Sequence, residues 1–234
     1  WGPLFFGSTT AFTEKFDANS LVTTIPAAPA LLGNTLRTKL IASKIPISGK
    51  VLTRVTDPNP EPREFLAKYS SPTMVDIIYF TNQKSDNALA ESLLKTVGFY
   101  KTGNVSLESG RETIVRHLEE KRYDFDGLVL ADGSGLSRAN KVKPISQVKF
   151  LADVMKEKYY DDFLKSLPIA GETGTLRRMF KSGNNYGQIF AKTGTLNGVK
   201  CLAGYIKTRD GRILSFSLLI NGYKGSVDQV KSKM

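Results

Sequence analysis

Residues 188–220 carry the sequence pattern that most restricts the fold of this chain. The run from Lys200 to Lys207 alternates as a half-buried strand does, and the Arg209-Asp-Gly-Arg212 segment after it is typical of a hairpin turn. Residues 213–220 then form the returning strand. Because the second half of that strand is apolar throughout, we expect it to be central and buried in the sheet. A further strand is predicted over 188–193, so an antiparallel sheet occupies the C-terminal third.

Helical periodicity dominates the chain before that sheet. Apolar residues recur at three- and four-residue spacing, and cap residues mark helix starts, which predicts helices over 27–41, from Ser71-Pro72 onward, and over 88–97, 109–120 and 145–155. Short strands are predicted over 50–55 and 126–130. Helices followed by an antiparallel sheet indicate the α+β class.

Composition removes several classes of function. The 234 residues contain one Cys and one His, which argues against a disulfide framework, a His-dependent nucleophile and a His-rich metal site, so we predict neither a metal nor a cofactor. No apolar run reaches the roughly 18–20 residues of a transmembrane segment. The net charge of +11 comes from scattered Lys and Arg residues, which does not favour nucleic-acid binding.

The segment Lys192-Thr-Gly194-Thr195 places a cation and small side chains at the end of a predicted strand. A lysine at such a position attracts a carboxylate, and the Thr193 hydroxyl adds a donor. Gly194 allows a ligand backbone to approach, and the N–H of Thr195 is suited to an oxygen that becomes negative during acyl transfer. The alternative is a strand end with a bulge. A second copy, Lys101-Thr-Gly103, follows a helix and is expected to have no role.

The segment Lys84-Ser-Asp-Asn87 lies between two predicted helices with apolar flanks. A polar cluster at this junction is expected either to cap the second helix or to serve chemistry. In the second case Ser85 relays a proton and Asn87 hydrogen-bonds a substrate amide.

Together the two segments resemble those of penicillin-binding proteins and serine β-lactamases, whose motifs are Ser-x-x-Lys, Ser-Asp-Asn and Lys-Thr-Gly. The resemblance is most specific to the class C, low-molecular-mass penicillin-binding proteins, which are D-alanyl-D-alanine carboxypeptidase/endopeptidases. It covers roughly residues 20–234 and rests on several segments: Tyr69–Met74, Lys84–Glu91, Asp132–Arg138, Leu167–Gly171, Gly174–Leu176, Ala191–Leu196 and Leu202–Tyr205.

The resemblance implies a five-stranded antiparallel sheet flanked by helices, incomplete here at both ends. It implies a serine that attacks a D-Ala-D-Ala stem peptide or cross-link of peptidoglycan, a periplasmic or other extracytoplasmic location, and β-lactams as ligands. Catalytic roles carry over to Ser85, Asn87 and Lys192, and substrate binding to Thr193, Gly194 and Thr195. Arg138 is a weaker substrate-binding candidate, with structural pairing as its alternative.

The nucleophile motif of the family should precede Ser85. The two matches to Ser-x-x-Lys, at 92–95 and 146–149, both follow it and are not expected to act. Since the family inserts accessory domains after its nucleophile motif, we expect a fragment in which residues 1–24 are a remnant of such a domain and 25–234 the C-terminal part of the catalytic domain. The fragment alone should not form an acyl-enzyme.

Two other interpretations remain open. A non-catalytic relative would bind peptidoglycan through the same cleft without ever having possessed Ser-x-x-Lys. A basic nucleic-acid-binding domain would make both motifs coincidental, and its affinity would depend steeply on salt.

Overall fold

The structure is a computed structural model that describes residues 28–52 and 70–232. The chain divides into two compact units, 1–69 and 70–234. In the first unit, helix α1 (Ala28–Ala42) confirms the predicted helix, whereas 50–52 form no strand and 53–55 lie outside the described residues. The predicted domain boundary at 24/25 also lies outside them. In the part of the chain that the structure describes, no helix combines the length and apolar character that a bilayer crossing requires.

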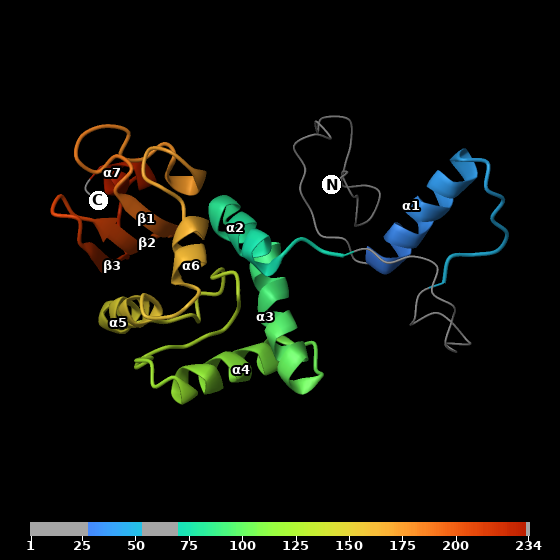
Figure 1. The fold of residues 1–234 in the computed structure, drawn as a ribbon, viewed down its shortest axis with the longest axis horizontal. Helices are drawn as coiled ribbons and strands as arrows, with labels where there is room; N and C mark the ends of the chain where they lie inside the picture. Colours follow the sequence, from blue (N-terminus) through green and yellow to red (C-terminus); the bar gives the residue numbers. More distant parts are fainter. Residues whose placement is uncertain (1–27, 53–69, 233–234) are drawn as a thin grey trace. The chain divides into compact units, whose positions relative to one another are not determined.

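The second unit contains an antiparallel sheet of three strands, in the order β1 (Ile189–Leu196), β2 (Val199–Lys207) and β3 (Ile213–Asn221) (Figure 1). The α+β class is confirmed. The five-stranded sheet does not hold for the described residues. The one further pairing with these strands is an isolated antiparallel bridge between Ile169 and Phe190 of β1, which does not extend into a strand. The central position predicted for 213–220 is also wrong, since β1 pairs with the other edge of β2 and leaves β3 outermost.

Helices surround this sheet. Their bounds are α2 Met74–Lys84, α3 Asn87–Thr102, α4 Leu107–Glu120, α5 Pro144–Val154, α6 Tyr160–Ser166, the 3₁₀ helix η1 Gly174–Leu176, and α7 Val227–Lys231. Helix α4 begins earlier than the predicted start at 109, because Ser106 is its N-cap and accepts a hydrogen bond from the N–H of Ser109. The predicted strand over 126–130 is reduced to a single bridge between Val129 and Lys141.

Alternate residues of the strands build two apolar clusters, because successive side chains point to opposite faces of a sheet. On one face Leu202 and Ala191 pack with Leu176 of η1. On the other face Tyr205 packs with Leu151 of α5, and its buried hydroxyl donates to the Leu151 carbonyl at 2.8 Å. The strand that carries Lys192 is therefore held from both faces.

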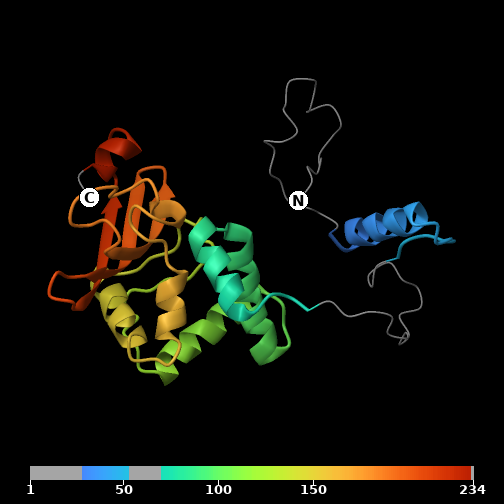
Figure 2. The same ribbon diagram turned by 45° about the horizontal axis from the view of Figure 1, so that its top comes forward.

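The C-terminal end of α2 is tied to the end of α6, and in both views α2 runs beside α6 (Figures 1 and 2). The side-chain amide of Asn82 donates to the Ser166 hydroxyl at 2.8 Å, and that of the buried Gln83 donates to the Ser166 carbonyl at 3.1 Å. Gly174 of η1 lies so close that an added Cβ would be 2.5 Å from Gln83 Oε1. These contacts hold the end of α2 against the segment that leads into β1.

Candidate active site

The junction between α2 and α3 consists of two residues, Ser85 and Asp86. Ser85 ends α2 in the left-handed region (φ 53°, ψ 50°), and its N–H donates to the carbonyl of Thr81. The carboxylate of Asp86 accepts the N–H of Leu89 at 2.9 Å and so caps α3. Because Asp86 provides the cap, the half-buried Ser85 side chain is not needed for it and is available for other contacts.

Lys192 reaches this junction from β1. Its ammonium donates to Ser85 Oγ at 2.5 Å and to its neighbour's carbonyl, that of Thr193, at 2.9 Å. Burial, and then the nearby charge of Lys200, lower the pKa of Lys192 below its usual value. Because the ammonium supplies only donors, Ser85 Oγ must accept, and the proton of the Ser85 hydroxyl is left to point elsewhere.

The residues after Lys192 present polar groups along the same strand. The Thr193 hydroxyl lies 2.9 Å from that of Thr175, the middle residue of η1. Thr195 is exposed, and its hydroxyl oxygen accepts a hydrogen bond from Lys200 of β2 at 2.5 Å. At Gly194 an added Cβ would approach nothing closer than Cys201 Cβ at 3.4 Å, an ordinary contact. Internal packing therefore does not demand a glycine there.

A cleft of about 1120 Å³ opens beside this strand. Thr193, Thr195 and Lys200 line it from the sheet, and Tyr79 and Phe80 line it from α2. Five cationic and two acidic residues line this cleft. The cationic residues are Lys84, Arg177, Arg178, Lys200 and Lys231, and the acidic residues are Glu172 and Asp228. Its charge suits an anionic ligand.

Asn87 and Arg138 are the remaining predicted site residues. Asn87 is exposed as the first residue of α3, and within residues 28–52 and 70–232 its side chain makes no hydrogen bond. Arg138 is exposed and donates to the carbonyl of Asn197, in the turn between β1 and β2, at 3.0 Å. The structure thus brings Ser85 and Lys192 together, while Arg138 braces the turn beyond Thr195.

Arg138 belongs to a loop organised by Asp132. The two carboxylate oxygens of Asp132 accept the N–H groups of Gly135 and Ser137 at 2.7 and 2.6 Å, and the side chain of Asn140 donates to the first of them at 2.8 Å. Burial acts to raise the pKa of Asp132, but these hydrogen bonds outweigh it and lower the pKa overall. The loop is therefore held by an ionised carboxylate, which explains the polar residues around Arg138 without any catalytic role for them.

Sequence reasoning missed two residues of this region, Lys200 and Thr175. Lys200 faces Thr195 in the strand register and is 4% exposed, which is rare for a lysine. Its place in an alternating strand, in phase with Leu202, could have indicated an inward position. Thr175 follows no pattern in the sequence that relates it to Thr193.

Comparisons with known proteins assign the chain to a family. Residues 9–234 match the D-Ala-D-Ala carboxypeptidase 3 (S13) family. The chain belongs to the S13 family. The S13 chain is 34% identical to D-alanyl-D-alanine carboxypeptidase DacB of Haemophilus influenzae over 192 residues, which are 81% of this chain and 40% of the relative. It is 31% identical to a D-alanyl-D-alanine carboxypeptidase of an Actinomadura species over 207 residues, 86% of this chain and 38% of the relative.

Solved structures agree with the family. The crystal structure of penicillin-binding protein 4 from Haemophilus influenzae, complexed with a novel β-lactam, superposes with a TM-score of 0.77 at 30% identity, over 88% of the S13 chain and 48% of that protein. An extended-spectrum β-lactamase, TLA-1, shares the fold with a TM-score of 0.52 at 17% identity, over 68% of this chain and 59% of that one. The S13 chain spans about 40% of the length of the curated relatives it matches.

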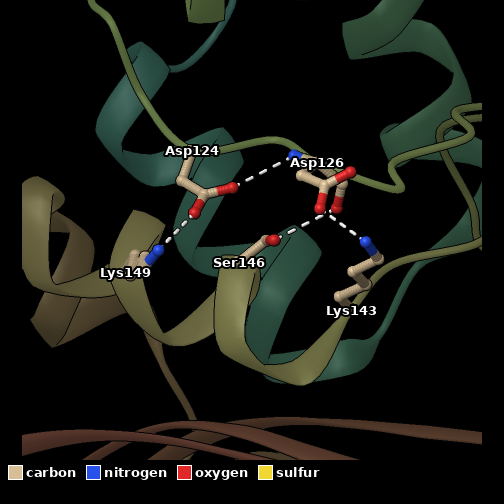
Figure 3. Close-up of polar contacts among 5 residues, drawn as sticks. All are labelled: Asp124, Asp126, Lys143, Ser146 and Lys149. Carbon is tan, nitrogen blue, oxygen red and sulfur yellow. Dashed lines mark hydrogen bonds and ion pairs between the residues drawn. The ribbon is translucent and has the colours of Figure 1, made fainter.

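Neither Ser-x-x-Lys match in the S13 chain forms a nucleophile–base pair. The buried Ser146 donates to the carbonyl of Asp126 at 3.1 Å, and Lys149 pairs with the carboxylate of Asp124 at 2.7 Å (Figure 3). Both groups thus fasten α5 to the preceding loop. Ser92 and Lys95 lie exposed on α3.

Proposed function

We propose that this chain is the C-terminal catalytic part of a serine-type D-Ala-D-Ala carboxypeptidase/endopeptidase that acts on peptidoglycan stem peptides. The observation that carries the proposal is the contact between the Lys192 ammonium and the Ser85 hydroxyl, whose chain neighbours Thr193 and Lys84 line a cationic cleft. Curated relatives named D-alanyl-D-alanine carboxypeptidase support it. In this proposal residues 25–234 belong to the catalytic domain and 1–24 to an accessory domain inserted before it.

The proposed reaction is acyl transfer to a serine. The serine hydroxyl gives its proton to the lysine of its Ser-x-x-Lys motif as its oxygen bonds to the carbonyl carbon of the scissile peptide. The C–N bond then breaks, and the leaving amine takes one proton, which Ser85 passes on and regains from that lysine. Ser85 can donate that proton, because its oxygen already accepts a hydrogen bond from Lys192. The N–H of Thr195 stabilises the developing oxyanion, and Asn87 hydrogen-bonds the peptide amide. Water then releases the acyl group.

The nucleophile in this proposal lies outside these 234 residues. Of the two Ser-x-x-Lys segments of the chain, Ser146 and Lys149 make other contacts, and Ser92 and Lys95 are exposed at the surface. Relatives of more than twice the matched length leave room for such a segment.

The proposed ligands are stem peptides and β-lactams, which share a carboxylate near the bond that is attacked. Lys192, Thr193 and the cationic residues of the cleft supply the complementary charge and donors. Gly194 keeps the edge of β1 open to the ligand backbone. Because peptidoglycan lies outside the cytoplasm, the proposed location is the periplasm or another extracytoplasmic part of the envelope.

Labelling of the full-length protein with a fluorescent penicillin tests the proposal. We expect covalent labelling of a serine in a Ser-x-x-Lys segment, located by mass spectrometry, and a reduction of about 100-fold in the acylation rate for Lys192→Ala. Lys101→Ala is the matched control, since Lys101 begins the second Lys-Thr-Gly segment but lies in the last turn of α3.

Two results would contradict the proposed function. Peptidoglycan binding without any labelling would identify a non-catalytic relative. Absence of labelling combined with tight, strongly salt-dependent binding of DNA or RNA would identify a nucleic-acid-binding domain.

A further inference from the structure

Lys200 is a buried cation without a counter-ion in the described residues. It is 4% exposed, and no carboxylate of residues 28–52 or 70–232 lies within 4 Å of its ammonium. Asp228 of α7, an acidic residue that lines the same cleft, pairs instead with Lys231 at 3.1 Å. A buried lysine that lacks a carboxylate is costly for folding, so a ligand contact is a natural compensation.

The one described hydrogen-bond partner of the Lys200 ammonium is the hydroxyl of Thr195. The two residues face each other across β1 and β2, which holds the contact in register. Because the ammonium can only donate, the Thr195 oxygen accepts, and the hydroxyl proton of Thr195 is directed away from Lys200. Because Thr195 is exposed and lines the cleft, its hydroxyl proton is available for a hydrogen bond to a ligand in the cleft.

The same arrangement occurs at Ser85, where Lys192 donates and the serine proton is left free. The two lysines are close enough for the charge of Lys200 to lower the pKa of Lys192. No described carboxylate neutralises this pair. An anion bound between the strand and the cleft would relieve the repulsion and accept a hydrogen bond from Thr195, whereas the Thr193 hydroxyl donates to Thr175.

We propose that Lys200 is a positioning residue for Thr195, which it sets as a hydrogen-bond donor to the free carboxylate of the ligand. Lys200 thereby contributes, through Thr195, to the preference of the site for a ligand with an unblocked carboxylate. This inference rests on the proposed function, because it takes the ligand of the cleft to be the substrate of acyl transfer.

The test compares two ligands in the full-length protein, benzylpenicillin and its methyl ester, by their acylation rate constants. We expect the wild type to be acylated faster by the acid than by the ester. The Lys200→Met substitution should reduce the ratio of the two rate constants, acid over ester, by about tenfold, which is the effect of one hydrogen bond to a charged group. Thr195→Val should reduce the ratio similarly. The double variant should lose no more than Thr195→Val alone, because Lys200 acts through that hydroxyl.

Lys207→Met is the matched control, since Lys207 is an exposed lysine of the same strand and its substitution should leave the ratio unchanged. A wild-type ratio in Lys200→Met, or full additivity with Thr195→Val, overturns the inference while acylation itself still supports the proposed function.

Equilibrium binding of N-acetyl-D-Ala-D-Ala and its C-terminal amide provides a readout that does not depend on acylation. We expect the wild type to bind the acid more tightly than the amide, and Lys200→Met to lose about tenfold of that preference. If the protein is not acylated, the proposed function fails, whereas an equal affinity of the wild type for acid and amide overturns the role of Lys200.

Discussion

The ammonium of Lys192 lies 2.5 Å from the hydroxyl of Ser85, although 107 positions separate the two residues in the chain. Three features produce this contact: the left-handed backbone of Ser85, the anchoring of the α2 end to Ser166, and the packing of both faces of β1. A cation that binds a serine oxygen leaves the serine proton available for donation. The contact therefore links the fold to the chemistry proposed for it.

Two substitutions at Ser85 should separate its backbone role from its hydroxyl. A left-handed conformation costs an L-residue about 1–2 kcal/mol that glycine avoids, so we expect Ser85→Gly to be about 1 kcal/mol more stable than Ser85→Ala in urea unfolding. Both variants lack the proton donor and should slow penicillin acylation of the full-length protein by about 100-fold or more. Equal stability of the two variants would argue against the left-handed backbone, and unimpaired acylation against the proton relay.

The decrease of the acylation rate at alkaline pH should depend on the charge of Lys192. Burial and then Lys200 lower the Lys192 pKa, and a role that needs the ammonium is present below that pKa and lost as pH rises through it. We therefore expect the rate to fall at a pH below the usual value of a lysine, and Lys200→Met to move the fall to higher pH. A pH–rate profile of penicillin acylation for both proteins measures this shift, and an unmoved limb contradicts the coupling.

The buried charge of Lys200 should lower the stability of the folded protein at neutral pH. Burial, and then the charge of Lys231, lower the pKa of Lys200, so the folded state binds this proton less well than the unfolded state does. The cost is complete below the lowered pKa and disappears as pH rises to the unfolded value. We expect Lys200→Met to raise the melting temperature at pH 7, and the difference from wild type to shrink towards pH 11. A lower melting temperature for the variant at pH 7 would show that the cation is stabilising.

The Asp124–Lys149 pair should make the protein sensitive to acid (Figure 3). The hydrogen bond from Lys149 is the main cause that lowers the pKa of Asp124 to about 2. Its stabilising contribution is complete above the unfolded pKa of about 4 and is lost as pH falls towards 2. Urea unfolding between pH 2 and 7 should show a steeper loss for wild type than for Asp124→Asn or Lys149→Met. Coincident profiles for the three proteins would exclude this contribution.

The contact between α3 and α4 should not tolerate a methyl group at Gly110. An added Cβ there would lie 2.3 Å from the carbonyl oxygen of Leu94, which is backbone and cannot move aside easily. Although alanine favours a helix over glycine, we expect Gly110→Ala to destabilise the protein by about 1–3 kcal/mol. Glu112→Ala, at an exposed position of the same helix, is the control and should change the urea midpoint little. Equal midpoints for the two variants would show that the helices can separate without cost.

Local patterns predicted much of the fold because they depend on neighbours in the chain. The alternation in 200–207 and the Arg209–Arg212 turn identified a hairpin that the structure contains as β2 and β3. The same reasoning misplaced β3 at the centre, because apolar character shows that a strand is covered but not which strands flank it. It also began α4 at Ser109, a residue that instead packs between helices as the cap is supplied by Ser106.

The sequence by itself determined the helices α1 to α5, the three strands with their hairpin turn, and the two segments whose resemblance led to the S13 family. It placed Lys192 on a strand and Ser85 between helices, since hydrogen bonding and burial over a few residues decide those features. Only the tertiary structure decided that Ser85 meets Lys192 and that Lys200 is buried against a neutral hydroxyl. Such contacts depend on how α2, η1 and the sheet pack together, and no short stretch of sequence contains that information.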